Sequence, residues 1–216
     1  MTHTLHRRGS EEDLKHEYLV FALAAKGINW DGSEARFKRA FQICLKYHPL
    51  NYGNTYTGNI YNATAEAVAD GMKPNAGFIA LFDNEQAVVE ILKELKQENL
   101  GQCIVVSGLF DHVHQCCRNA GLEPHTVNIS GGIRGRTDKL APEPILEINT
   151  MCGHALVSFN LIKKMVEEIR AGGITALDAA KKMALNCHCG MFNCDRAARI
   201  LTSLATENQT AGAAAS

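Results

Sequence analysis

Four of the cysteines lie in two short segments whose spacing could hold a metal ion. Cys152 stands in the sequence Met-Cys-Gly-His, and Cys187, Cys189 and Cys194 fall within residues 187–194. Thiolates are soft ligands that favour zinc, copper(I) or iron–sulfur clusters. The Cys-x-Cys-x4-Cys spacing matches neither the Cys-x2-Cys pairs of zinc fingers nor the ferredoxin run. The spacing therefore predicts a metal centre without naming the metal.

The number of thiolate ligands decides what such a centre does. Four would close a structural zinc site or complete a cluster, whereas three would leave one position open for a substrate. We expect Cys152 to follow the carboxyl end of a strand and to begin a helix, and ligands bind at that edge of open α/β sheets. This placement favours an open centre ligated by Cys152, Cys187 and Cys189, with Cys194 as the candidate fourth ligand. The alternatives are a buried cysteine that only begins a helix and a cysteine-rich loop that binds nothing.

Cys152 could also work without a metal. A helix N-terminus favours the thiolate, and His154 or His125 could exchange protons with it. The Met-Cys-Gly-His segment resembles the stretch around one catalytic cysteine of the proline racemase family, in which a thiol removes an α-proton. The resemblance covers residues 151–154, and the second motif of that family, Cys-Gly-Thr-Gly, is absent from this chain. It implies thiol acid–base catalysis at Cys152.

Two glycine-containing loops that follow predicted strands could bind an anion. Ser107 and Gly108 would leave backbone amides free at the start of a helix, which suits a carboxylate or phosphate. The second loop contains three glycines and two arginines: Gly131, Gly132, Gly135, Arg134 and Arg136. Arginine presents a fork of donors and glycine exposes backbone amides, so this loop favours a small anionic substrate. A surface loop with solvated arginines is the alternative.

The other four cysteines carry weaker signals. Cys44 lies on an apolar helical stripe and Cys103 begins a predicted strand, so both are expected to be small buried hydrophobic residues. Cys116 and Cys117 fall inside a predicted helix and could approach the site, although adjacent residues of a helix point in different directions.

The composition excludes several classes of protein. The 216 residues include 22 Lys plus Arg and 23 Asp plus Glu, so a net charge of -1 gives no indication of nucleic-acid binding. No apolar run approaches the roughly 18–20 residues of a membrane span, and residues 1–8 lack the apolar core of a secretion signal. We therefore expect a cytoplasmic protein without a membrane or nucleic-acid partner. In that reducing compartment, eight cysteines indicate metal, cluster or thiol chemistry before disulfides.

The elements that must position these residues follow an alternating pattern from residue 77 onward. Short apolar runs at 77–82, 103–107, 126–130 and 145–149 predict strands, and helical periodicity follows them. Such alternation is typical of βαβ units, so we expect an α/β fold with a small parallel or mixed sheet of three to four strands flanked by helices. The N- and C-terminal thirds are expected to be helical, including the apolar run 18–25, with a loop over 50–62.

These expectations combine into an organisation and a function. We expect a helical region over residues 1–76, an α/β core with C-terminal helices and the cysteine-rich loop over 77–205, and a disordered tail over 206–216. The leading hypothesis is an iron–sulfur enzyme of lyase or hydratase type, acting on a small anion held by Arg134 or Arg136. A metal-free thiol enzyme using Cys152 and a non-catalytic zinc- or cluster-bearing binding or redox module are the alternatives. An apolar face between the helices would favour a homodimer.

Overall fold

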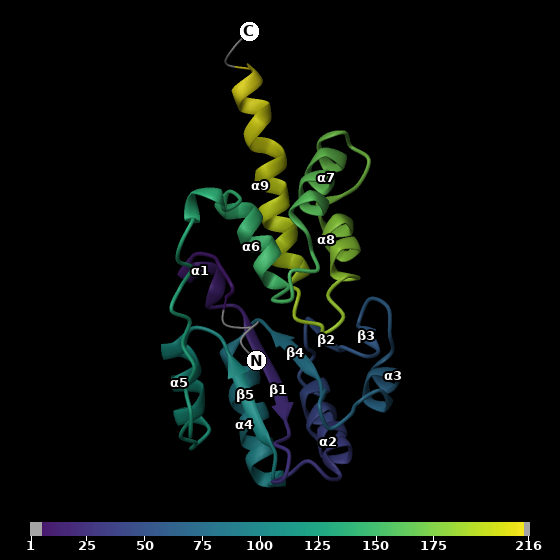
Figure 1. Cartoon of the computed structure of the whole chain (residues 1–216), viewed down its shortest axis with the longest axis vertical. Helices are drawn as coiled ribbons and strands as arrows, with labels where there is room; N and C mark the ends of the chain where they lie inside the picture. The colour runs from purple at the N-terminus through teal and green to yellow at the C-terminus, as the bar shows by residue number, and fades with distance from the viewer. Residues whose placement is uncertain (1–5, 214–216) are drawn as a thin grey trace. The chain divides into compact units, whose positions relative to one another are not determined.

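A computed structural model describes residues 6–213 of the chain, with side chains described through residue 207. These residues form two compact units (Figure 1). Within the described range, unit 1 contains residues 6–9, 130–187 and 192–213, and unit 2 contains residues 10–129 and 188–191. A short piece of the cysteine-rich loop thus packs with the N-terminal part of the chain.

Unit 2 is built on a five-stranded sheet with the strand order β3-β2-β4-β1-β5. The strands are β1 (Tyr18–Leu23), β2 (Asn51–Asn54), β3 (Gly58–Asn59), β4 (Ile79–Phe82) and β5 (Cys103–Ser107). All neighbouring strands are antiparallel, and Val20 of β1 lies opposite Ala80 of β4 and Val106 of β5. The expected parallel or mixed sheet of three to four strands is therefore wrong, although the α/β class is confirmed.

The central strand β1 comes from an apolar run that we expected to be helical. Every residue from Tyr18 to Ala22 is buried, so neither face of this strand carries the polar residues that would give a two-residue alternation. A strand buried on both faces and a buried helix have similar apolar runs, which explains the error. The expected loop over 50–62 likewise contains the short strands β2 and β3.

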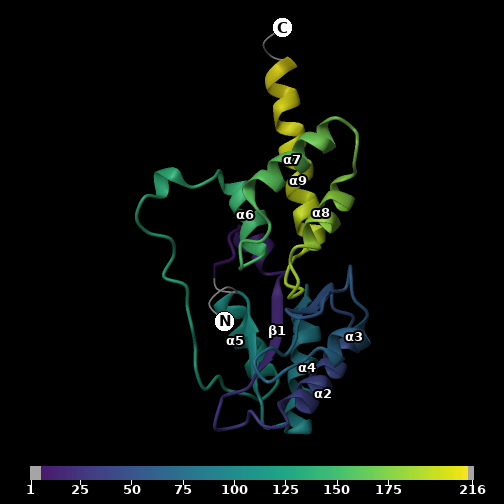
Figure 2. The same cartoon turned by 45° about the vertical axis from the view of Figure 1, so that its right-hand side comes forward.

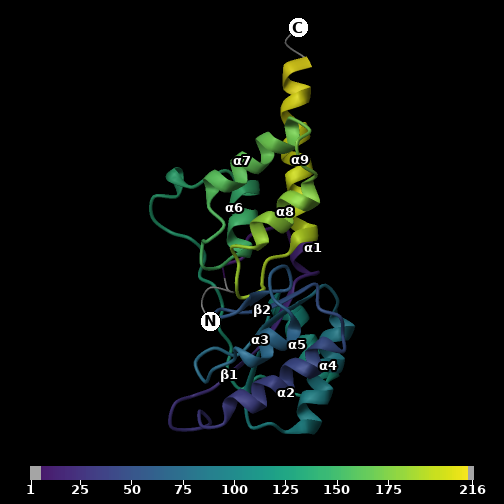
Figure 3. The same cartoon turned by 90° about the vertical axis from the view of Figure 1, so that its right-hand side faces the viewer.

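One face of the sheet is covered by helices α2 (Ser33–Leu45) and α4 (Glu85–Glu98), which lie side by side (Figure 3). Phe37 and Phe41 of α2 and Val88 and Ile91 of α4 are buried in the same core as Val20. The other helices of unit 2 are α1 (Glu11–Leu14), α3 (Ala65–Asp70) and α5 (Phe110–Asn119). The predicted strands at 77–82 and 103–107 and the helices after them are confirmed.

Unit 1 is helical (Figure 2). Its helices are α6 (Glu143–Met151), α7 (Phe159–Arg170), α8 (Ala176–Ala184) and α9 (Cys194–Ala213), and a 3₁₀ turn spans Thr137–Lys139. The predicted strands at 126–130 and 145–149 are wrong, because the first segment has no regular structure and the second lies within α6. In α6 the apolar residues Ile145, Leu146 and Ile148 are buried on the helix. Residues 206–213, expected to be disordered, continue α9, and residues 214–216 lie outside the described range.

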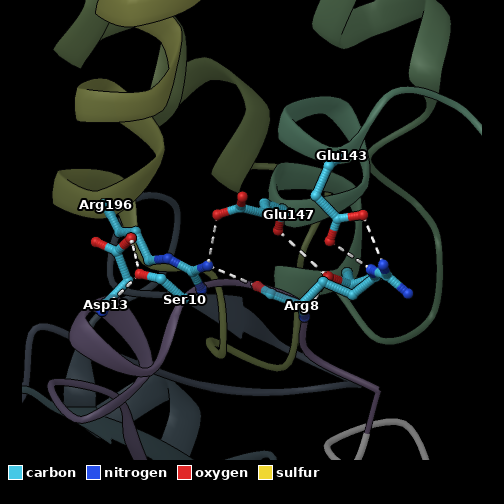
Figure 4. Close-up of polar contacts among 7 residues, drawn as sticks. Arg8, Ser10, Asp13, Glu143, Glu147 and Arg196 are labelled. Carbon is cyan, nitrogen blue, oxygen red and sulfur yellow. Dashed lines mark hydrogen bonds and ion pairs between the residues drawn. The ribbon is translucent and has the colours of Figure 1, made fainter. Parts of the chain in front are cut away.

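A buried ion pair joins α9 to α6 within unit 1. Arg196 is 1% exposed, and its guanidinium donates hydrogen bonds to Glu147 at 3.0 Å and to the backbone oxygen of Arg8 at 2.6 Å (Figure 4). Gly9 makes room for this contact, because a Cβ there would lie 2.0 Å from the guanidinium. The Arg8 side chain forms a second, more exposed pair with Glu143, at 2.6 Å. These contacts fix residues 8 and 9 on the helices of unit 1.

None of the helices within residues 6–213 combines the length and the apolar character that crossing a bilayer requires.

Candidate thiol site and its surroundings

Cys152 lies at the carboxyl end of helix α6, and α7 begins only at Phe159. The expectation that Cys152 begins a helix after a strand is therefore wrong. The chain turns immediately after it, where the amide of Ala155 donates to the oxygen of Cys152 at 2.9 Å. The carboxyl end of a helix carries partial negative charge, so the helix dipole disfavours a thiolate at this position.

The thiols of Cys152 and Cys187 contact each other inside unit 1. Cys152 is 1% exposed and Cys187 is fully buried, and Cys187 follows the end of α8. A hydrogen bond with Cys187, followed by burial, raises the pKa of the Cys152 thiol well above its ordinary range. The structure thus brings together two of the four predicted ligands from two separate helix ends.

Backbone amides also surround the Cys152 sulfur. The amides of Leu156 and His154 donate hydrogen bonds to it and lower the pKa of the thiol, although they do not outweigh Cys187 and burial. His154 takes part through its backbone, and its side chain is exposed. Amide hydrogen bonds to sulfur are one of the means by which proteins tune thiolate-bound metal centres.

The other two predicted ligands are also buried. Cys194 is the first residue of α9 in unit 1, and Cys189 belongs to the segment 188–191 of unit 2. Among the residues that the structure describes, no group of three or more His, Cys, Asp or Glu side chains is arranged to hold a metal ion. The candidate site therefore rests on the hydrogen bond between the thiols of Cys152 and Cys187.

The segment 188–191 is fixed to strand β2 by two glycines. A Cβ on Gly53 would lie 2.4 Å from the oxygen of His188, and a Cβ on Gly190 would lie 2.1 Å from the carbonyl carbon of Tyr52. Gly190 also has a φ of +77°, in the left-handed region that favours glycine. Backbone therefore packs directly on backbone, and Cys189 is positioned by steric constraints that sequence reasoning missed. In the sequence, the close approach of these two backbone segments is indicated only by Gly53 and Gly190 themselves.

The predicted anion-binding residues are not gathered around Cys152. Arg136 is exposed and pairs with Asp138 at 2.9 Å, and no hydrogen bond or ion pair joins Arg134 or Arg136 to the cysteines of the described chain. The amide of Gly132 donates to the Ser130 hydroxyl at 3.2 Å, and Gly131 is exposed with open space around it.

The other predicted residues lie in unit 2. His125 is exposed, and its ring nitrogens face the Cys103 sulfur at 3.7 Å and the Thr126 hydroxyl at 3.1 Å. Ser107 ends β5, and Gly108 packs against the side chains of Tyr18 and Val113. Both residues precede α5, whose first turn has no side-chain cap.

A second polar group was missed entirely. Tyr18, Glu85 and His112 meet in unit 2 through hydrogen bonds between side chains of three elements. The predicted helices beginning near 83 and 110 each follow a strand, and this order could have indicated that Glu85 and His112 share a sheet edge.

Comparison with protein-family models, with curated proteins and with solved structures finds no match for this chain.

Proposed function

We propose that unit 1 carries a soft-metal centre in which Cys152 and Cys187 are the principal ligands, with zinc or an iron–sulfur cluster as its metal. The observation that carries the proposal is the contact between these two buried thiols, together with the amides of Leu156 and His154 that donate to the Cys152 sulfur.

The electrostatics of the pair favour a cation between the sulfurs. Two thiolates this close in a buried position repel each other, and burial opposes the charge of each. Without a metal, the contact with Cys187 and burial therefore keep the Cys152 thiol protonated. A divalent cation reverses this balance, because it compensates both charges and displaces both protons. In the metal-bound state the amides of Leu156 and His154 would also stabilise the charged Cys152 sulfur.

The remaining ligands are proposed from the sequence. Cys194 begins α9 in the same unit and is buried. Cys189 stays a ligand prediction from the Cys-x-Cys-x4-Cys spacing alone. Four thiolates would give a closed zinc site or a complete cluster, and three would leave an iron open to a substrate. An open iron would polarise a small anionic substrate in lyase or hydratase chemistry, with Arg134 or Arg136 as the anion-binding groups.

The metal-free alternative has less support. A nucleophilic or basic cysteine needs an accessible sulfur and a lowered pKa. Cys152 has the opposite properties, because it is 1% exposed, ends a helix and has a raised pKa. A metal ligand can have these properties, because the positive charge of the metal ion compensates the negative charge of the buried thiolate.

The test is the metal content of protein purified without oxygen. We expect wild-type protein to contain stoichiometric iron with acid-labile sulfide, or stoichiometric zinc. Cys152→Ser and Cys187→Ser should each lose that metal. Cys103→Ser is the matched control, because Cys103 lies on strand β5 of unit 2 and is partly exposed, and it should keep the metal.

Two results would overturn the proposal. One is wild-type protein without metal above background, in which mild oxidation joins Cys152 to Cys187 as a disulfide; the pair would then be a redox dithiol. The other is full metal content in both Cys152→Ser and Cys187→Ser. If the metal is present, unfolding measurements with and without a chelator separate the structural module from the enzyme. A structural metal contributes directly to folding, whereas loss of a catalytic metal leaves the fold largely stable.

A further inference from the structure

A polar cluster lies at one end of the sheet in unit 2 and includes none of the cysteines of the proposed metal centre. Strands β4 and β5 are both antiparallel to β1, so their carboxyl ends meet its amino end, with Tyr18 opposite Phe82 and Leu19 opposite Ser107. Helices α4 and α5 begin just beyond these ends. Their first turns place Glu85 and His112 beside Tyr18.

The three side chains form a connected hydrogen-bond network. The Tyr18 hydroxyl donates to Glu85 Oε1 at 3.0 Å, and His112 Nδ1 hydrogen-bonds the same carboxylate oxygen. The Tyr18 oxygen and His112 Nδ1 lie 3.5 Å apart. The tyrosine ring is fully buried, whereas the side chain of His112 is 30% exposed. The side chain of Glu85 is 43% exposed, so the network is anchored in the core by Tyr18 and reaches solvent through both the carboxylate and the imidazole.

The protonation of the network fixes the role of each nitrogen of His112. The hydrogen bond from His112, followed by that from Tyr18, lowers the pKa of Glu85, so this carboxylate is charged near neutral pH. Burial and the neighbouring Glu85 raise the pKa of Tyr18, so its hydroxyl keeps its proton. Because the carboxylate accepts from Nδ1–H, the free base form of His112 carries its lone pair on Nε2.

A small pocket lies beside this imidazole. It has a volume of about 180 Å³ and is lined by Lys15, His16, Asp83, Asn84, Glu85 and His112. This space is smaller than the roughly 300–1,000 Å³ of sites that hold larger ligands, so it suits a substrate with few heavy atoms. The Lys15 ammonium pairs with Glu12 at 2.7 Å, and the His16 ring contacts the backbone oxygen of Asp83 at 3.3 Å.

We propose that this pocket is an ester-hydrolysing site for small carboxylic esters, with His112 as the general base and Glu85 as its positioning residue. His112 Nε2 takes a proton from a water molecule while the water oxygen attacks the acyl carbon. The carbon–oxygen bond to the alcohol then breaks, and the imidazolium returns its proton to the leaving alkoxide. Ester and water thus give a carboxylic acid and an alcohol, and the enzyme is unchanged. Glu85 stabilises the imidazolium, as the carboxylate of a catalytic dyad does.

The probe for this site is p-nitrophenyl acetate, whose acyl group fits a small pocket. Steady-state release of p-nitrophenolate is measured after any initial burst, because thiols and amines become acylated once without turning over. His112→Gln should lower the steady-state rate about a hundredfold, the contribution typical of a positioned general base. His114→Gln is the matched control on the same helix, since His114 stacks on Phe110 and contacts Arg118, and it should keep the wild-type rate.

The positioning role of Glu85 has its own readout. Glu85→Gln should lower kcat about tenfold and leave KM close to the wild-type value, because the imidazole loses the carboxylate that orients it while the pocket keeps its lining. The other residues that line the pocket, Lys15, His16, Asp83 and Asn84, are unchanged in this variant. Circular dichroism verifies that each variant is folded. Tyr18→Phe is a second variant of the network: it keeps the ring in the core and removes only the hydroxyl that donates to Glu85. A wild-type steady-state rate equal to that of His112→Gln, or a Glu85→Gln variant with the wild-type kcat, would overturn the proposal.

Discussion

The buried ion pair between Arg196 and Glu147 gives a quantitative test of the structure of unit 1. Glu147→Ala removes the carboxylate that accepts from a guanidinium with 1% exposure. Breaking a buried pair from one side costs about 3–5 kcal/mol. The backbone oxygen of Arg8 still accepts from the same nitrogen, so we expect the lower limit, about 3 kcal/mol. For a chain of this length that corresponds to a decrease in melting temperature of about 6–12 °C.

The matched control is one turn away on the same helix. Glu143→Ala removes the partner of Arg8, but the two side chains of that pair are 34% and 48% exposed. Exposed pairs contribute about 0–1 kcal/mol, so Glu143→Ala should change the melting temperature by no more than a few degrees. Alanine is a good helix former at both positions, so helix propensity does not separate the two variants.

The assay is thermal and urea unfolding followed by helical circular dichroism. Glu147→Gln, which keeps an oxygen acceptor but removes the charge, should fall between wild type and Glu147→Ala. An equal loss of unfolding free energy in Glu147→Ala and Glu143→Ala would refute the reasoning, because a buried and an exposed ion pair would then contribute equally to stability.

Three further predictions concern unit 2 and the thiols. Gly53→Ala should destabilise the protein by about 1–3 kcal/mol in urea unfolding, since its Cβ would overlap the backbone of residues 188–189. Gly131→Ala is the control: there is open space around Gly131, so this variant should stay within about 0.5 kcal/mol of wild type in the same assay. The pKa of Glu85 is lowered from 4.5 in the folded state, so its contribution to stability is complete above pH 4.5 and is lost as the pH falls through the lower folded value. Below pH 4.5, the urea midpoint of Glu85→Gln should therefore change less with pH than that of the wild type. The same change of midpoint with pH in both proteins would contradict this. In metal-free native protein, iodoacetamide should label the partly exposed Cys103 before the buried Cys152, and mass spectrometry showing the reverse order would contradict the burial of the thiol pair.

The strands and helices were predictable where local sequence decides them. Thr175 caps α8 by accepting from the amide of Asp178, and the apolar stripe of α4 is buried as its spacing indicates. The strand β1 was not predictable, because its run of apolar residues has no alternation to separate it from a helix. In α6 the opposite error arose, since isoleucines at 145 and 148 favour a strand by composition but share one face of a helix.

The sheet topology depends on a contact that no local pattern encodes. The order strand, helix, strand from β4 through α4 to β5 does place these two strands parallel to each other, as a βαβ unit requires. The N-terminal strand β1 lies between them and is antiparallel to both. A segment from the start of the chain therefore converts an expected parallel pair into an antiparallel sheet, and its amino end brings Tyr18 to the helices that carry Glu85 and His112.

The candidate thiol site shows how one helix boundary changes the chemistry expected of a residue. The sequence pattern separated four candidate ligands from core cysteines, but all four are buried and Cys103, expected to be buried, is partly exposed. The structure brings two of the four, Cys152 and Cys187, into contact. At the start of a helix, Cys152 would be an accessible thiolate suited to nucleophilic or acid–base work. At the end of α6, the helix dipole, burial and Cys187 all oppose its ionisation, and only two backbone amides favour it. A sulfur in that setting gains most from a bound cation, so the position of the α6 terminus moves the balance from thiol catalysis toward metal ligation.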